Sequence, residues 1–66
     1  MVVVANGNPV TLEEGARLTD LYAALGVDAR WVVAECNGEA VPRADAPATL
    51  LRDGDRVELV RAVAGG

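Results

Sequence analysis

The sequence contains no histidine and only one cysteine, Cys36. Without histidine the chain lacks the ligand set that a zinc or iron site needs, and one thiol cannot form an internal disulfide. A small-molecule active site is also disfavoured, because no nucleophile and base are clustered in the sequence. We therefore expect no metal, no bound cofactor, and a reducing, cytoplasmic setting.

Lysine and phenylalanine are also absent, and there is one tryptophan and one tyrosine. The interior must therefore be built mainly from Val, Leu and Ala. A chain of 66 residues buries only about 60% of its unfolded surface, which supports one small domain. The opening MVVVA is too short for a signal sequence or a membrane span, so we expect a soluble protein.

The charge balance disfavours one class of partner. Ten acidic residues stand against six arginines and give a net charge of −4. No basic cluster is present to neutralise phosphates, so nucleic acid is disfavoured and a partner with a basic face is favoured. Without lysine, the chain cannot receive an isopeptide bond on a lysine side chain of its own copies.

The first half of the chain predicts a hairpin followed by a helix. The β-branched run 2–4 leads into the turn pair Asn6-Gly7, which predicts a hairpin over residues 1–12, and Pro9 places its second strand at a sheet edge. After Gly15 the apolar spacing changes to that of one helical face, which predicts a helix over residues 17–25 that ends at Gly26. The stripe consists of Leu18, Leu21, Tyr22 and Leu25.

The second half predicts another hairpin, a crossover and a last strand. WVVAECNGEAVP contains the turn pair Asn37-Gly38, and alternation assigns one group of residues to the core face and another to the open face. RADAPATLL is a crossover that admits one helical turn, and either Leu50 or Leu51 fills the core. RDGD then turns the chain into a strand from Arg56 to Val63. The core-face group is Val32, Ala34 and Cys36, and the open-face group is Trp31, Val33 and Glu35.

This order of elements predicts an α+β fold. A mixed sheet of about five strands with one helix packed across one face accounts for it, and the other face stays open to solvent or a partner. We expect the domain to cover residues 1–61 and a flexible C-terminal tail to cover residues 62–66.

The tail ends in Gly65 and Gly66, which folding does not require. Glycine has no Cβ, so this end is thin and can adopt backbone angles that other residues avoid. Extended at about 3.3 Å per residue, residues 62–66 reach roughly 16 Å, enough to carry a carboxylate into another protein. Taken alone, a Gly-Gly end is a weak motif, and a frayed terminus is by far the better interpretation of it.

The whole chain, however, resembles the ubiquitin-like β-grasp sulfur carriers, and most closely the ThiS-type carriers of thiazole (thiamine) biosynthesis. The resemblance rests on the early NG turn, LYAALG, VVAECNGEAVPR and LRDGDRVELVRAVAGG. The combination of NGEAVPR, DGDRVE and a final AGG is specific, although each piece alone is not.

The resemblance implies a function for the tail. An adenylating enzyme of the ubiquitin-activating type uses ATP to convert the carboxylate of Gly66 to an acyl-adenylate, and a sulfurtransferase or cysteine desulfurase replaces AMP with sulfur. Thiazole synthase then consumes the thiocarboxylate. The chain would be a recycled co-substrate and not an enzyme, with Gly65 slim enough to thread the partner's channel.

Other residues are assigned by their place in the expected fold. Val60, Val63 and Ala64 are candidates for partner contacts, with Val60 on the open face if Val57 and Leu59 face the helix; a strand buried on both sides is the alternative for Val60. Cys36 is expected in the core and not as a persulfide acceptor. Four charged residues near the tail are expected to be ordinary solvated groups rather than steering groups. They are Asp53, Asp55, Arg56 and Arg61.

Three alternatives remain at this stage. The small subunit of molybdopterin synthase and other thiocarboxylate sulfur donors share the tail chemistry, although the molybdopterin family usually has a longer chain and a proline-rich approach to the glycines. A protein-conjugating modifier also shares the tail. A β-grasp interaction module without tail chemistry would explain the core and the acidic surface equally well.

Overall fold

The computed structural model describes residues 1–62 and confirms the predicted order of elements. The last strand ends at Arg61, and Val63 lies outside the described residues. The helix begins one residue later than expected. The elements are β1 (Val2–Ala5), β2 (Asn8–Thr11), α1 (Leu18–Leu25), the 3₁₀ turn η1 (Ala29–Trp31), β3 (Val32–Cys36), β4 (Glu39–Val41), the 3₁₀ helix η2 (Arg43–Ala48) and β5 (Arg56–Arg61).

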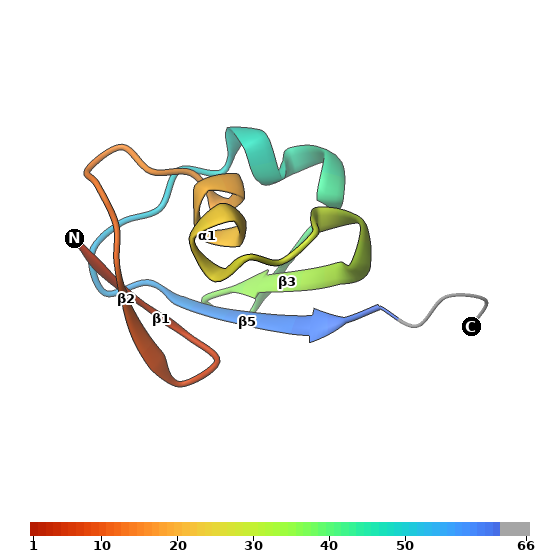
Figure 1. The fold of residues 1–66 in the computed structure, drawn as a ribbon, viewed down its shortest axis with the longest axis horizontal. Helices are drawn as coiled ribbons and strands as arrows, with labels where there is room; N and C mark the ends of the chain where they lie inside the picture. The colour runs from red at the N-terminus through yellow and green to blue at the C-terminus, as the bar shows by residue number, and fades with distance from the viewer. Residues whose placement is uncertain (63–66) are drawn as a thin grey trace.

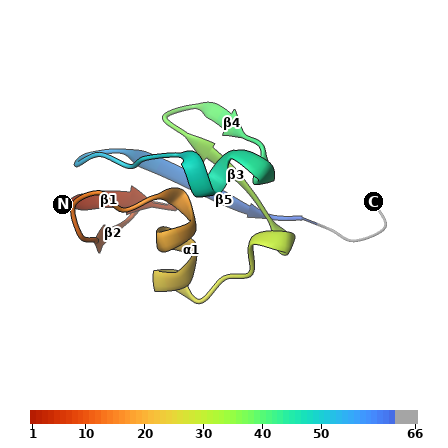
Figure 2. The ribbon, with the colours of Figure 1, turned by 90° about the horizontal axis from the view of Figure 1, so that it is seen from above.

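The strands form one mixed sheet in the order β2-β1-β5-β3-β4, which is the expected β-grasp arrangement. The central pair β1 and β5 is parallel, and the other pairs are antiparallel. The edge position predicted for β2 from Pro9 is confirmed. Helices α1 and η2 lie on the same side of the sheet, so its other face is the open face of the described structure (Figures 1 and 2). No helix in residues 1–62 is long and apolar enough to cross a membrane.

Both ends of α1 are set by local sequence. The carboxylate of Asp20 accepts a hydrogen bond from the backbone N–H of Arg17 at 2.7 Å, which satisfies a donor at the first turn. At the other end Gly26 adopts φ 69°, and the N–H of Val27 donates to the carbonyl of Tyr22 at 3.0 Å. This pairing is a Schellman end, which explains why the helix stops where glycine follows leucine.

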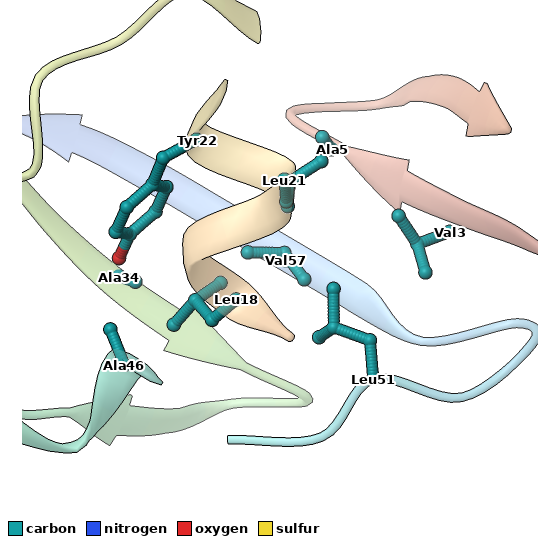
Figure 3. Packing of buried hydrophobic residues seen from close by; sticks show 9 residues of the cluster. All are labelled: Val3, Ala5, Leu18, Leu21, Tyr22, Ala34, Ala46, Leu51 and Val57. Atoms are coloured by element: carbon teal, nitrogen blue, oxygen red, sulfur yellow. The ribbon is translucent and has the colours of Figure 1, made fainter. Parts of the chain in front are cut away.

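The core lies between α1 and the sheet and is almost entirely aliphatic. Leu51 fills it at 2% exposure, whereas Leu50 is 51% exposed, so the structure decides between the two. Leu25, expected to complete the helical stripe, is instead 40% exposed. Alanines at three positions let the helices approach the strands closely. The cluster in Figure 3 contains Val3, Ala5, Leu18, Leu21, Tyr22, Ala34, Ala46, Leu51 and Val57.

One local prediction is wrong. Trp31 was expected to begin the strand and face the open side of the sheet, but it ends η1. Asp28 causes the change, because its carboxylate accepts the backbone N–H of Arg30 at 2.9 Å and caps one 3₁₀ turn. As a result Trp31 lies on the helix side of the sheet, 46% exposed.

Candidate functional site

The candidate site is the tail end of β5, where the described structure leads into the Ala-Gly-Gly sequence. The backbone N–H of Ala62 donates to the carbonyl of Trp31 at 2.7 Å, so β3 and η1 hold the chain up to this residue. The remaining predicted site residues lie outside the described residues, and their roles stay predictions. They are Val63, Ala64, Gly65 and Gly66.

Val60 lies on the open face of the sheet, as predicted. Val57 is fully buried toward α1 and Leu59 is half-buried on the same side, whereas Val60 is 62% exposed on the other. It pairs across the strands with Val33, which is 51% exposed. We call Val33 and Val60 the valine pair. The alternative, in which β5 is buried on both sides at Val60, is therefore wrong. The valine pair forms an exposed apolar patch next to the residue where the tail begins.

Two carboxylates adjoin the valine pair. Glu35 and Glu58 are direct partners in the β3·β5 register, both are exposed, and neither makes an ion pair within residues 1–62. Like charges directly opposite each other across two strands repel. The acidic pair, Glu35 and Glu58, therefore offers a place for a cation from outside the domain.

A groove lies on the helix side of the same strand end, and the sequence analysis missed it. Its volume is about 590 Å³, and its walls come from the end of α1, η1, the β1–β2 hairpin and β5. The exposed large side chains in it are Leu25 and Trp31. The only signal of this groove in the sequence was that Leu25 and Trp31, both apolar, flank the short segment GVDAR. The opposite wall includes Arg61, which is distant along the chain, so a local pattern could not reveal it.

The wall at η1 carries an exposed ion pair. Arg30 donates to Asp28 at 2.7 Å, and its guanidinium lies 6.0 Å from the centre of the Trp31 ring. Hydrogen bonds from Arg30 lower the pKa of Asp28 from its usual 3.8 to about 2. Asp28 and Arg30 are therefore both charged at neutral pH, beside the Trp31 indole that lines the groove.

Asn6 connects the first hairpin to β5 through two hydrogen bonds. Its Oδ1 accepts from the N–H of Leu59 at 2.7 Å, and its Nδ2 donates to the carbonyl of Leu59 at 3.2 Å. The register of β1 with β5 ends at Val57. Beyond it, the side-chain amide of Asn6 makes the two hydrogen bonds to Leu59 that the backbone of one further β1 residue would otherwise make. The same residue has φ 49° and forms the turn with Gly7 at φ 82°, a type I′ geometry.

Cys36 packs against the core and lies far from the tail. Its register partner is Val57, near the start of β5, whereas the tail follows Arg61. Burial, with the nearby carboxylates of Asp55 and Glu39, raises the pKa of the thiol. The neutral thiol that dominates near neutral pH is a poor nucleophile, which agrees with the predicted core position.

The charged residues near the turn are placed differently from the prediction. Arg56 begins β5, Asp53 and Asp55 precede it in the turn, and only Arg61 lies at its tail end. Asp53 accepts the N–H of Val2 at 2.6 Å, and Asp55 accepts the N–H of Arg52 at 2.8 Å. These two carboxylates thus stabilise the turn into β5.

The class of protein follows from these features: a ubiquitin-like β-grasp domain whose last strand continues into a Gly-Gly sequence past an exposed apolar patch. More narrowly, the chain belongs to the ThiS family, whose model matches residues 3–66.

Individual relatives agree with this assignment. The sulfur carrier protein ThiS of Thermus thermophilus is 38% identical over 65 residues, which are 98% of this chain and 100% of the relative. A crystal structure of the thiamine biosynthesis protein ThiS from Geobacter metallireducens shares 39% identity, covers all of both chains and superposes with a TM-score of 0.84.

A second kind of relative is much longer. A thiazole synthase of Paramagnetospirillum magneticum is 35% identical over 66 residues, which are 100% of this chain but only 20% of that protein. The chain therefore spans about one fifth of this relative.

Proposed function

We propose that this chain is a sulfur carrier of thiamine biosynthesis, whose Gly66 carboxylate is converted to a thiocarboxylate that supplies sulfur for the thiazole ring. The observation that carries the proposal is that the family match runs through the tail to residue 66. The carrier named ThiS in T. thermophilus is matched over its whole length. These relatives favour thiazole synthesis over the molybdopterin alternative.

The chemistry takes place on Gly66 inside partner enzymes. A carboxylate reacts poorly with nucleophiles because it is negatively charged and has no good leaving group. In an adenylating enzyme the carboxylate attacks the α-phosphate of ATP, which releases pyrophosphate and leaves an acyl-adenylate. The terminal sulfur of a persulfide on a sulfurtransferase or cysteine desulfurase then displaces AMP, and a thiol cleaves the resulting acyl disulfide. The products are the thiocarboxylate and a disulfide on the donor.

Thiazole synthase is the acceptor in this proposal. A protein of that name contains a segment similar to this entire chain, which supports a link between this chain and thiazole synthase. After the sulfur is transferred, the chain returns with an ordinary carboxylate. It therefore acts as a recycled co-substrate rather than an enzyme.

The domain contributes the docking surface. The valine pair offers apolar area beside the root of the tail, and the acidic pair next to it favours an arginine or lysine on the partner. A surface of this kind lets a partner bind the rigid sheet while the thin tail enters its active site.

High-resolution intact mass tests the proposal. The chain is incubated with ATP, an adenylating enzyme and a persulfide donor from the same organism. Exchange of one oxygen for sulfur has the same nominal mass change as oxidation of Met1 or Cys36, so fragment ions must place the change at Gly66. A Cys36→Ala variant is the control and should gain sulfur equally. A wild-type chain that remains a carboxylate with competent partners would refute the proposal.

A further inference from the structure

The last residues of β5 run beyond β1 with one edge uncovered. The final β1 partner is Val57, so residues 58–61 continue for roughly 13 Å at about 3.3 Å per residue without a neighbouring strand on that side. The side chain of Asn6 already forms hydrogen bonds with the backbone N–H and C=O of Leu59 at this edge. Arg61 is the next residue along β5 whose backbone groups point to the same edge.

The register shows where the backbone groups of Arg61 point. In an antiparallel pair, hydrogen-bonded and non-hydrogen-bonded positions alternate. Ala62 donates to Trp31, so that pair is hydrogen-bonded, and the preceding pair of Arg61 with Val32 is not. The N–H and C=O of Arg61 therefore point away from β3, toward the edge, and pair with no backbone group of residues 1–62.

The groove lies beside this edge. Arg61 and Leu59 form one wall, and Leu25, Val27 and Trp31 form the apolar part. In an added strand, alternate side chains would point into the groove and onto the open face near the valine pair. An uncovered strand edge next to an apolar groove is the geometry that binds extended peptides by β-strand addition.

We infer that an extended segment of thiazole synthase adds to the edge of β5 by pairing with the backbone N–H and C=O of Arg61, and places an apolar side chain in the groove between Leu25 and Trp31. The inference rests on the proposed function. A partner that takes the tail must contact the chain immediately beyond Ala62, so its surface continues onto this edge. A second copy of the chain is disfavoured, because each copy carries a net charge of −4.

Hydrogen exchange of single amides tests the pairing directly. In the free chain the Arg61 amide should exchange faster than the Ala62 amide, which donates to Trp31 at 2.7 Å. In the complex with thiazole synthase, the Arg61 amide should slow by about tenfold or more, as a new hydrogen bond and burial require. Protection that depends on carrier concentration without the synthase would assign the edge to a second copy and overturn the inference.

Two substitutions separate the backbone group from the side chain. Arg61→Pro removes the N–H and places a ring at the edge, whereas Arg61→Ala removes only the charged side chain. We expect the proline variant to bind thiazole synthase about tenfold more weakly than the alanine variant, since a partner carbonyl loses its donor. If the proline variant fails to fold, a synthetic chain with an ester between Val60 and Arg61 removes the same N–H.

The outcomes distinguish this inference from the proposed function. If the wild-type chain gains sulfur at Gly66 and binds the synthase, but both Arg61 variants bind equally, strand addition is wrong and the function stands. If the wild-type chain neither gains sulfur nor binds the synthase, the proposed function fails, and the inference fails with it.

Discussion

At the scale of single residues, asparagine has two separate tasks in this chain. Both Asn-Gly turns need positive φ, which is why the hairpins could be predicted from the sequence; Asn6 has φ 49° and Asn37 has φ 52°. The hydrogen bonds that their side chains make to β5 could not be predicted. Asn6 bonds to Leu59 across 53 positions of the chain, and a local pattern carries no information on such a pairing.

The amide of Asn6 gives the first prediction. Asn6→Asp keeps an acceptor for the N–H of Leu59 but replaces the donor to its carbonyl with a carboxylate oxygen. We expect the free energy of unfolding at neutral pH to fall by about 1–3 kcal/mol. Chemical denaturation measures it. Asn8→Asp adds the same charge to the same hairpin without losing a bond to β5, so an equal loss in both variants would contradict this role.

Asp28 provides a test by titration. Its pKa is lowered to about 2 in the folded chain, so its ion pair with Arg30 stabilises the fold above the usual pKa of 3.8 and is lost as the pH falls toward 2. Both side chains are largely exposed, and the effect on stability is therefore small. An NMR titration of the Asp28 carboxyl should show the low pKa, and Arg30→Gln should raise it. The backbone N–H of residue 30 still donates to Asp28 in that variant, so an unchanged pKa would exclude the Arg30 side chain as the cause.

At the scale of elements, the two faces of β5 differ sharply in burial. Val57 faces the core at 0% exposure, and Val60 faces outward at 62%. The alternation was predictable, because one strand has a period of two. The groove was not, since it needs the end of α1, the first hairpin and β5 to meet, and Trp31 had been assigned to the wrong face.

The same substitution on the two faces of β5 should have opposite consequences. Val60→Asp leaves the core intact, so we expect a small change in melting temperature and weaker binding to thiazole synthase. Val57→Asp puts a carboxylate into an apolar cluster without a partner and should unfold the domain. Circular dichroism melts and a binding titration measure both effects. A Val60→Asp variant that melts far lower yet binds normally would show that Val60 is structural.

At the scale of the whole molecule, the fold and the proposed chemistry occupy different parts of the chain. Every residue of the core cluster lies between Val3 and Val57. Deleting Gly65 and Gly66 should therefore leave the denaturation midpoint unchanged and abolish thiocarboxylate formation. Paired unfolding curves and intact mass spectra measure the two properties. A large loss of stability in the shortened chain would show that the tail takes part in folding.

The net charge of the molecule makes association with its partner sensitive to salt. The chain carries −4 overall, and the acidic pair adjoins the valine pair that we expect to dock. Attraction to a basic surface raises the association rate, and salt screens it over a Debye length of about 8 Å at physiological ionic strength. We therefore expect the rate of association with thiazole synthase to fall as salt is added.

Replacing the acidic pair tests where this attraction acts. Glu35→Gln with Glu58→Gln should flatten the salt dependence of the association rate and remove the repulsion between the two strands, which stabilises the fold by roughly 0.2–1 kcal/mol. Glu13→Gln with Glu14→Gln makes the same change in net charge in the loop between β2 and α1, outside the β3·β5 pair. Stopped-flow mixing over a salt series measures the rates. Equal flattening in both double variants would mean that only the net charge matters, whereas flattening confined to the first pair would place a basic side chain of the partner beside Glu35 and Glu58.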